Sequence, residues 1–308
     1  LKLFKVPLIL LPFAVWFIIA TFTSTTATEN VRPFDPAALY VKQTLPVTLP
    51  GDMALMPDGP SLYVLQRLSS GVESALVIID TTTYQTQTIP LGFGMALGLD
   101  FMPDGSKLFV AISKGSGDIT STGSNRIVAI NPANGSTIAT IPTGSTNPHG
   151  PTQVAVSPNA EDAYVTNRGP HLVHVVDTAT NTLGSTFTIQ YVPIALAFSP
   201  DGSRVYTVNR FTNDVAAINT TNNSLITKIS LSLAPSVSEN SIAITSDGTR
   251  AFVTSSGSAN IAVLDINPNS PTYHQQVGTL TTTGNALNRV IVTPDDHYAF
   301  VVSQGTDE

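Results

Sequence analysis

Four basic residues recur at one position of a repeated unit, and they are the strongest chemical signal in the chain. Each lies 10 or 11 residues after the first residue of a turn, and the four are Arg67, Lys114, Arg168 and Arg210. The chain is otherwise acidic, with 21 Asp and Glu residues against 14 Lys and Arg and a net charge of −7. A channel mouth that is lined by charges of one sign concentrates the electrostatic potential there. The pattern therefore predicts a subsite for a carboxylate or a phosphate.

A second interpretation of the same residues is structural. Repeats copy residues whether or not they act on a ligand. On that interpretation the arginines pair with acids of their own unit, such as Asp177 or Asp214. The fifth and sixth units carry Ser256 and Gln304 at the same position, so the basic set spans the first four units only.

Two further side chains are candidates for the same site. His149 lies in the segment GSTNPHGPTQ, directly before a predicted inner strand, where a neutral imidazole can ligate a metal or act as a base. Asp100 interrupts the apolar run LGLDFM. A buried carboxylate needs partners, and these are either the basic residues or the neighbouring backbone amides. We expect both residues at the mouth of a central channel.

Sequence motifs for catalysis are missing. The chain has no cysteine, which excludes disulfides and a thiol nucleophile. It has no Gly-x-Ser-x-Gly, no His-Glu-x-x-His and no phosphate-binding glycine loop. The histidine spacings match no known ligand set, and the acidic charge argues against nucleic-acid binding. We therefore predict no catalytic residue, no metal and no cofactor.

The elements that position these residues come from an internal repeat. Two apolar strands flank a turn of the Pro-Asp-Gly kind, in which each residue type favours a tight reversal. The turn recurs at Pro57, Pro103, Pro158, Pro200, Ser246 and Pro294. In the fourth unit we expect strands over residues 195–199, 204–209, 214–219 and 225–229. Such a unit predicts a four-stranded antiparallel meander, which is the blade of a β-propeller. A β-sandwich is the alternative, but it does not repeat one turn at near-constant spacing.

Strand sequences carry a family resemblance. Tyr164–Asn167 spells YVTN, Tyr206–Asn209 is a near copy, and Val175–Thr182 and Ile141–Gly144 fit the same pattern. The chain resembles the YVTN-type β-propeller family of prokaryotic surface-layer and periplasmic proteins, roughly over residues 45–304. The resemblance implies an all-β propeller, usually of seven blades. Five full units and half of a sixth are visible, so the propeller over 45–308 is expected to be truncated in its last blade.

The N-terminal part suggests export. Lys2 and Lys5 precede the apolar run Val6–Ala20, and a small-residue site follows, so residues 1–27 are predicted to be a secretory signal. A retained membrane anchor is the alternative. Residues 28–44 are expected to be a linker, and Val41–Leu49 to pair with the blade at the opposite end of the chain. The predicted location is periplasmic, extracellular or on the cell surface.

These observations favour a non-catalytic binding or interaction module, because the scaffold is clear and catalytic motifs are missing. The expected partner is an anionic small molecule or a protein of the cell envelope. One alternative is a propeller enzyme, either a lactone hydrolase or a subunit like those of quinone- or haem-linked dehydrogenases. The other is an envelope protein that assembles with itself.

Overall fold

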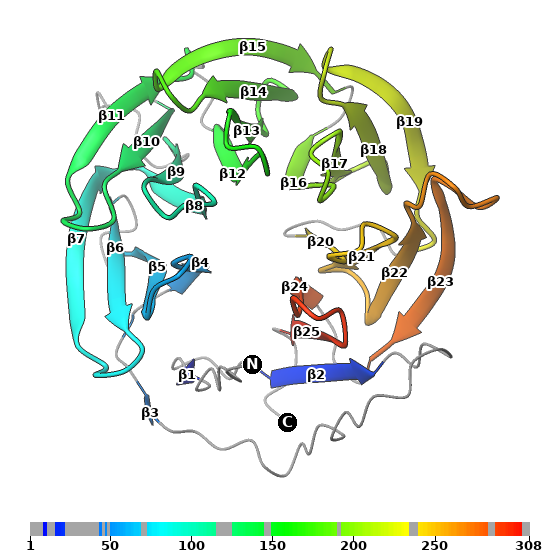
Figure 1. Ribbon diagram of the computed structural model, residues 1–308, viewed down its shortest axis with the longest axis horizontal. Coiled ribbons are helices and arrows are strands. Elements are labelled where there is room, and N and C mark those ends of the chain that lie inside the picture. Colours follow the sequence, from blue (N-terminus) through cyan, green and yellow to red (C-terminus); the bar gives the residue numbers. More distant parts are fainter. Residues whose placement is uncertain are drawn as a thin grey trace.

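The computed structural model describes residues 9–10, 16–21, 43–44, 47, 50–68, 73–114, 125–144, 149–189, 192–233, 240–282 and 287–303. Six β-sheets stand around a central axis as blades (Figure 1). Blades 1 to 5 are four-stranded and antiparallel, with the strands in chain order from the axis to the rim. This confirms the predicted all-β propeller of four-stranded blades.

The strands follow the repeat closely. Blade 1 contains β4 (Pro50–Leu55), β5 (Ser61–Arg67), β6 (Glu73–Asp80) and β7 (Thr86–Phe93). Blade 2 contains β8 (Met95–Phe101), β9 (Leu108–Ser113), β10 (Arg126–Ile130) and β11 (Thr137–Pro142). Blade 3 contains β12 (Pro151–Val156), β13 (Asp162–Asn167), β14 (Leu172–Asp177) and β15 (Thr182–Thr188). Blade 4 contains β16 (Pro193–Phe198), β17 (Arg204–Asn209), β18 (Asp214–Asn219) and β19 (Ser224–Ser230).

Blades 5 and 6 complete the set. Blade 5 contains β20 (Asn240–Ile244), β21 (Arg250–Ser255), β22 (Asn260–Asp265) and β23 (Gln275–Thr281). Blade 6 contains β24 (Leu287–Val292) and β25 (Tyr298–Ser303), and a third strand comes from the N-terminal part of the chain.

The repeated turn holds its shape through its own side chains. In blade 4 the carboxylate of Asp201 accepts hydrogen bonds from the backbone N–H of Ser203 at 3.0 Å and from its hydroxyl at 2.8 Å. Gly202 has a φ of 69°, in the left-handed region that glycine tolerates best. Asp104 and Asp247 bond Ser106 and Thr249 in the same way. The inner hairpin is therefore specified locally, which explains why the turn is visible in the sequence.

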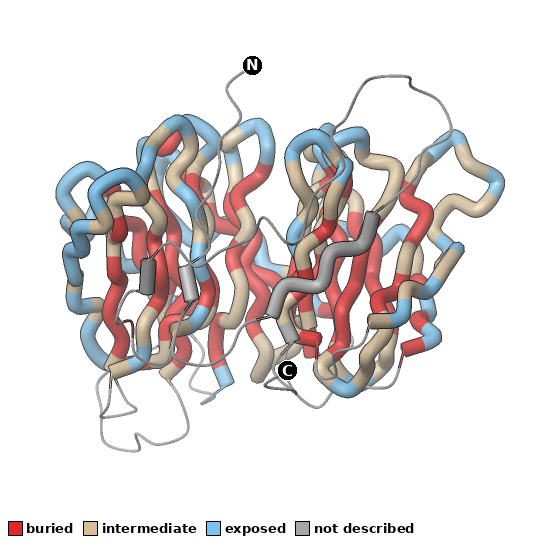
Figure 2. Tube along the Cα trace, turned by 90° about the horizontal axis from the view of Figure 1, so that it is seen from below, coloured by how far each residue is buried: buried red, intermediate tan, exposed pale blue. Residues whose placement is uncertain are grey.

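An aromatic layer packs the blades against one another. The second strand of every blade has an aromatic residue six positions after the turn: Tyr63, Phe109, Tyr164, Tyr206, Phe252 and Phe300. Phe101 of blade 2 meets the ring of Tyr63 edge-on at 4.9 Å, and Phe198 of blade 4 meets Tyr164 at 5.0 Å. Figure 2 shows the result, with buried residues along the strands and exposed residues at the turns.

The strand that joins blade 6 differs from the one predicted. β2 (Trp16–Thr21) pairs antiparallel with β25, and Thr21 lies opposite Tyr298. Within the predicted closing segment Val41–Leu49, β3 (Gln43–Thr44) instead pairs in parallel with β1 (Ile9–Leu10), and Val47 packs on blade 1. The remainder of the predicted signal and linker, residues 1–44, lies outside the described residues. No helix in the described part of the chain is long and apolar enough to cross a membrane.

Candidate functional site

Two sets of loops lie at one end of the blades, opposite the repeated turns. One set joins the second and third strands, and the other leads from each rim strand to the next inner strand; we call this end the loop face. Backbone hydrogen bonds join the two sets. The N–H of Arg168 donates to the carbonyl of Gly150 at 3.1 Å, and the N–H of Gly169 donates to that of His149 at 2.5 Å. In the next blade, the N–H of Arg210 donates to the carbonyl of Val192 at 2.9 Å.

The loop face is most tightly built where blades 2 and 3 meet. The N–H of Gly150 donates to the hydroxyl of Ser113 at 2.9 Å, and the N–H of Lys114 donates to Oδ1 of Asn125 at 2.7 Å. A Cβ atom on residue 150 would lie 1.9 Å from that same Oδ1, so only glycine fits. The segment of His149 therefore bridges the end of β9, next to Lys114, and the end of β13, next to Arg168.

The structure places five of the six predicted mouth residues on the loop face, and Asp100 is the exception. Arg67 and His149 are exposed, and Lys114, Arg168 and Arg210 are half-buried. Backbone bonds and the hydroxyl of Ser113 bring the segments of Lys114, His149 and Arg168 to one junction, and Arg210 holds the equivalent place one blade further on.

The predicted alternative, an ion pair within the blade, is not what holds Arg210. Among the residues that the structure describes, Arg210 makes no ion pair. Its guanidinium lies 5.1 Å from the ring centroid of Phe211, whose side chain is 63% exposed. The carboxylate of Asp214 instead accepts a hydrogen bond from the side chain of Asn209 at 2.6 Å. A half-buried cation thus lies beside an exposed aromatic ring on the loop face.

Asp100 does not join the basic residues. One oxygen of its carboxylate accepts from the N–H of Phe101 at 2.9 Å, and the other accepts from the N–H of Val156 at 2.8 Å. These bonds tie the inner strands of blades 2 and 3. Burial raises the pKa of Asp100 to about 6, although the two amide donors oppose the shift. The second alternative, bonding to backbone amides, accounts for this residue.

A polar cluster on the axis was missed by the sequence analysis. Asp52 of blade 1 forms an ion pair with Arg289 of blade 6 and accepts a hydrogen bond from Gln153 of blade 3 at 3.1 Å. Arg289 also donates to Gln153 Oε1 at 3.3 Å. The side chain of Asp52 is 2% exposed, and that of Arg289 is 36% exposed. Burial lowers the pKa of Arg289 to about 10, so it stays charged at neutral pH.

We call Asp52, Gln153 and Arg289 the axial latch. A sequence signal for it existed, because all three lie five residues before the first residue of their turns. At the same position Gly98 leaves room for the neighbouring blade, since a Cβ there would lie 2.7 Å from the Cα of Gln153. The latch joins three blades across the axis and therefore takes a structural role.

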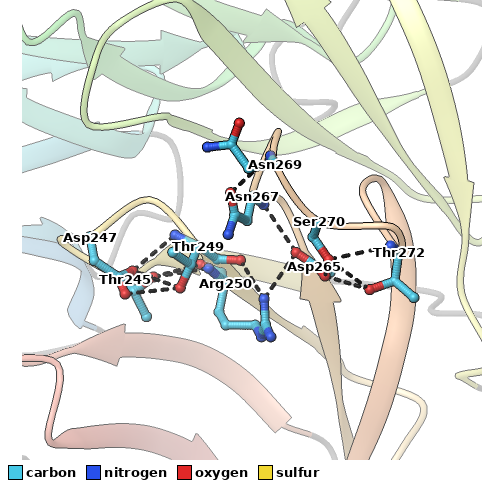
Figure 3. Close-up of polar contacts among 9 residues, drawn as sticks. All are labelled: Thr245, Asp247, Thr249, Arg250, Asp265, Asn267, Asn269, Ser270 and Thr272. Carbon is cyan, nitrogen blue, oxygen red and sulfur yellow. Dashed lines mark hydrogen bonds and ion pairs between the residues drawn. The ribbon is translucent and has the colours of Figure 1, made fainter.

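A second polar cluster lies at the opposite end of blade 5 (Figure 3). The carboxylate of Asp265 is 1% exposed and accepts from Arg250 at 2.9 Å and from the hydroxyls of Ser270 and Thr272 at 2.5 Å each. Burial opposes ionisation, but these donors and the N–H of Asn267 hold the pKa of Asp265 below its ordinary value. Because the carboxylate is fully engaged within the blade, the cluster fixes the loop after β22 and offers nothing to a ligand.

Metal chemistry has no visible support in the described residues. No group of three His, Asp or Glu side chains in the described ranges could hold a metal ion. His174 is buried, with its ring nitrogens 3.0 Å from the side chains of Asn167 and Thr186. The basic side chains of the loop face have the chemistry to bind and orient an anion.

Comparisons with known proteins agree with the fold. No protein-family model matches the chain, and no curated protein matches its sequence. Hydrazine synthase from Kuenenia stuttgartiensis is similar in structure, with a TM-score of 0.57 and 14% identity over 85% of this chain and 95% of that one. A functionally unknown protein from Desulfotomaculum acetoxidans has a TM-score of 0.60 and 18% identity over 80% of this chain and 73% of that one. At these identities the likeness shows the propeller fold alone.

Proposed function

We propose that the protein is an exported, non-catalytic propeller of the YVTN type that binds a small anionic ligand on its loop face. The observation that carries the proposal is the junction of blades 2 and 3. There, backbone bonds join the segments of His149 and Arg168, and the hydroxyl of Ser113 joins the segment of His149 to that of Lys114. Three residues whose side chains can donate hydrogen bonds therefore belong to one junction of the loop face in an otherwise acidic protein.

The adjoining blade extends this surface. Arg210 lies at the same position of its blade and packs beside the exposed ring of Phe211. An arginine donates two parallel hydrogen bonds to a carboxylate or phosphate, and such charge-assisted bonds are stronger than neutral ones. A ligand with one anionic group and a flat apolar part fits a guanidinium next to an aromatic ring.

Calorimetric titration with inorganic phosphate, succinate and benzoate tests the proposal. The double variant Arg168→Ala with Arg210→Ala should raise the Kd of the bound anion at least about tenfold, because a hydrogen bond to a charged group contributes about 1.5–3 kcal/mol. Lys228→Met serves as the matched control, since Lys228 lies on the rim strand β19 and carries the same charge. Unchanged affinity in the double variant, or an equal loss in the control, refutes the proposed site.

Export rests on the two lysines before an apolar run of 15 residues, Val6–Ala20. N-terminal sequencing of the protein recovered from a bacterial periplasm should show a start near Thr28. A protein that retains Lys2 and stays in the cytoplasm contradicts export without touching the ligand proposal.

A further inference from the structure

Blade 5 carries an insertion that departs from the repeat. The connection between β22 and β23 spans residues 266–274, whereas the corresponding connection in blade 4 spans only residues 220–223. The carboxylate of Asp265 holds the longer loop in place through the hydroxyls of Ser270 and Thr272 (Figure 3). Residues outside a repeat are not copied with it, and loops on a rigid scaffold often carry function. The insertion is therefore where a function particular to this chain should be sought.

The insertion ends in two stacked rings. The ring centroids of Tyr273 and His274 are 3.6 Å apart, and the guanidinium of Arg204 in blade 4 lies 5.6 Å from the centroid of the Tyr273 ring. The hydroxyl of Tyr206, a fully buried residue of blade 4, bonds Nε2 of His274 at 3.1 Å. His274 has a φ of 60°, a conformation that costs energy in a residue other than glycine. The packing of blade 5 on blade 4 therefore fixes the imidazole in one place.

This imidazole has a hydrogen-bond donor that the protein leaves unused. Burial raises the pKa of Tyr206 above its usual value, so its hydroxyl keeps its hydrogen and donates it to Nε2 of His274. Burial, with Arg204 nearby, lowers the pKa of His274 to about 4, so the ring is neutral at pH 7 and carries its hydrogen on Nδ1. Within the described ranges no group bonds Nδ1. His274 therefore keeps one uncharged N–H donor for a ligand.

His274 lines a groove between the rim strands β19 and β23 of neighbouring blades (Figure 1). Its volume is about 620 Å³, within the usual range of small-molecule sites. Gln276 ties the two blades together there, because it accepts from the N–H of Ser232 at 2.8 Å and donates to its hydroxyl at 2.6 Å. Other uncharged polar residues of the lining are Ser230, Gln275 and Thr279. We call this groove the rim groove.

The lining of the rim groove suits a neutral ligand that is rich in hydroxyl groups. Side-chain amides and the hydroxyls of Ser and Thr both donate and accept hydrogen bonds, as each hydroxyl of a sugar does. Val277, which is 43% exposed, and Gly278 add an apolar strip for the C–H face of a sugar ring. A charged ligand would lack a free counter-charge. Lys228, the one charged residue in the described lining, already interacts with another group of the chain.

We propose that the rim groove binds a neutral saccharide. The Nδ1–H group of His274 and the side-chain amide of Gln275 bond its hydroxyls, and a sugar ring packs on Val277. None of the predicted mouth residues of the loop face lines the rim groove. It is therefore a second site, and its failure leaves the proposed anion site untouched.

NMR titration of the full chain with maltose, cellobiose and N,N′-diacetylchitobiose tests the proposal. At least one of the three should shift the backbone ¹H–¹⁵N signals of residues 230–232 and 275–279, with a Kd of about 0.1–10 mM. Long-range ¹H–¹⁵N correlation, which reports the ring nitrogens of histidine, should show the Nδ1 signal of His274 move with the same Kd. If none of the three sugars shifts these signals at about 50 mM, or if the Nδ1 signal stays in place while the backbone signals move, the proposed site is overturned.

A bulky substitution blocks the rim groove without entering the core. Val277→Trp should raise the Kd of the bound sugar at least about tenfold, because the indole occupies the place of the sugar ring. Ile226→Trp is the matched control, since Ile226 lies on the rim strand β19, is 42% exposed and is not a lining residue. The control should bind as the wild type does. An equal loss of affinity in both variants overturns the proposal.

A polar substitution tests the hydrogen bonds. Gln275→Ala removes an exposed amide from the lining and should raise the Kd at least about threefold. Gln87→Ala removes an exposed glutamine from the rim strand β7 of blade 1 and should leave the Kd unchanged. Unchanged affinity in Gln275→Ala together with unchanged affinity in Val277→Trp places the sugar elsewhere and refutes the site.

Two further titrations separate the other occupants. The neutral peptide acetyl-Thr-Val-Thr-Val-amide can add as a strand to the edge of a rim strand. Shifts of the signals of residues 275–279 on addition of this peptide, with none on addition of the sugars, identify a peptide groove and overturn the proposal. Anion binding on the loop face should be the same in Val277→Trp as in the wild type. A parallel loss of both ligands means that one site takes both, which contradicts a separate saccharide site.

Discussion

The replacement Asp52→Asn tests the axial latch directly. The carboxylate of Asp52 accepts from four donors: the N–H groups of Met53 and Leu99, the amide of Gln153 and the guanidinium of Arg289. An asparagine keeps one acceptor oxygen and turns an N–H₂ group toward donors. At least two of the four donors then lose their acceptor, and Arg289 loses its counter-charge.

The expected loss follows from burial. A buried donor without an acceptor costs about 1–3 kcal/mol, and breaking a buried ion pair costs about 3–5 kcal/mol. The side chain of Arg289 is 36% exposed, so water compensates part of that loss. We expect Asp52→Asn to reduce the free energy of unfolding by about 2–4 kcal/mol. For a domain of more than about 250 residues, the loss corresponds to a fall in Tm of roughly 4–8 °C.

Urea denaturation at pH 7, followed by circular dichroism, measures the effect. Asp58→Asn is the matched control, because Asp58 is an exposed turn residue of the same blade with a φ of 55°, which asparagine tolerates. A double-mutant cycle with Arg289→Gln should give a coupling energy of about 0.5–3 kcal/mol. A loss of stability from Asp52→Asn no larger than that of the control, with an unchanged m-value, would falsify the role of the latch.

Three further predictions concern other parts of the molecule. Gly150→Ala should destabilise the protein by about 1–3 kcal/mol through the contact with Asn125, and urea denaturation should show a smaller loss in an Asn125→Ala background; an equal loss in both backgrounds contradicts the contact. Burial raises the pKa of Asp100 to about 6, above its ordinary 3.8, so the folded state binds more protons, and this contribution to stability is lost as pH rises from about 4 to 6. The free energy of unfolding of the wild type, measured relative to that of Asp100→Asn, should therefore fall across that range. Burial, with Arg204 nearby, lowers the pKa of His274 to about 4, so the contribution of His274 to stability is lost as pH falls from 6.5 to 4. His274→Gln should remove this dependence of the free energy of unfolding on pH, and an unchanged dependence assigns it to other groups.

Loop-face residues could be found from the sequence because they keep one phase of the repeat. Arg168 and Arg210 follow their turns by the same distance, and equivalent positions of a repeat lie at equivalent places in space. The residues that hold them in place were not predicted. Asn125 and Gly150 act through a contact between two loops of different blades, and the spacing within one unit carries no signal of such a contact.

The axial latch shows the same limit more clearly. Asp52 and Arg289 come from the first and last blades, and they meet only because the ring brings these blades together. The strand that extends blade 6 was likewise not predicted. β2 adds to β25 through backbone hydrogen bonds. Many apolar sequences can form such bonds, so the sequence does not specify which segment pairs there.

The sequence by itself determined the blade. Its turns, its apolar inner strands and its aromatic positions are encoded within each unit, because Pro, Asp and Gly specify the hairpin locally and period-two patterns specify the strand faces. The tertiary structure alone decided how the units combine. It selected Asp52 rather than Asp100 as the partner of a cation, left Arg210 beside an exposed ring, and left Met53 and Leu55 of blade 1 exposed. Those outcomes depend on the curvature of the ring, which arises from the packing of whole blades and not from any one segment.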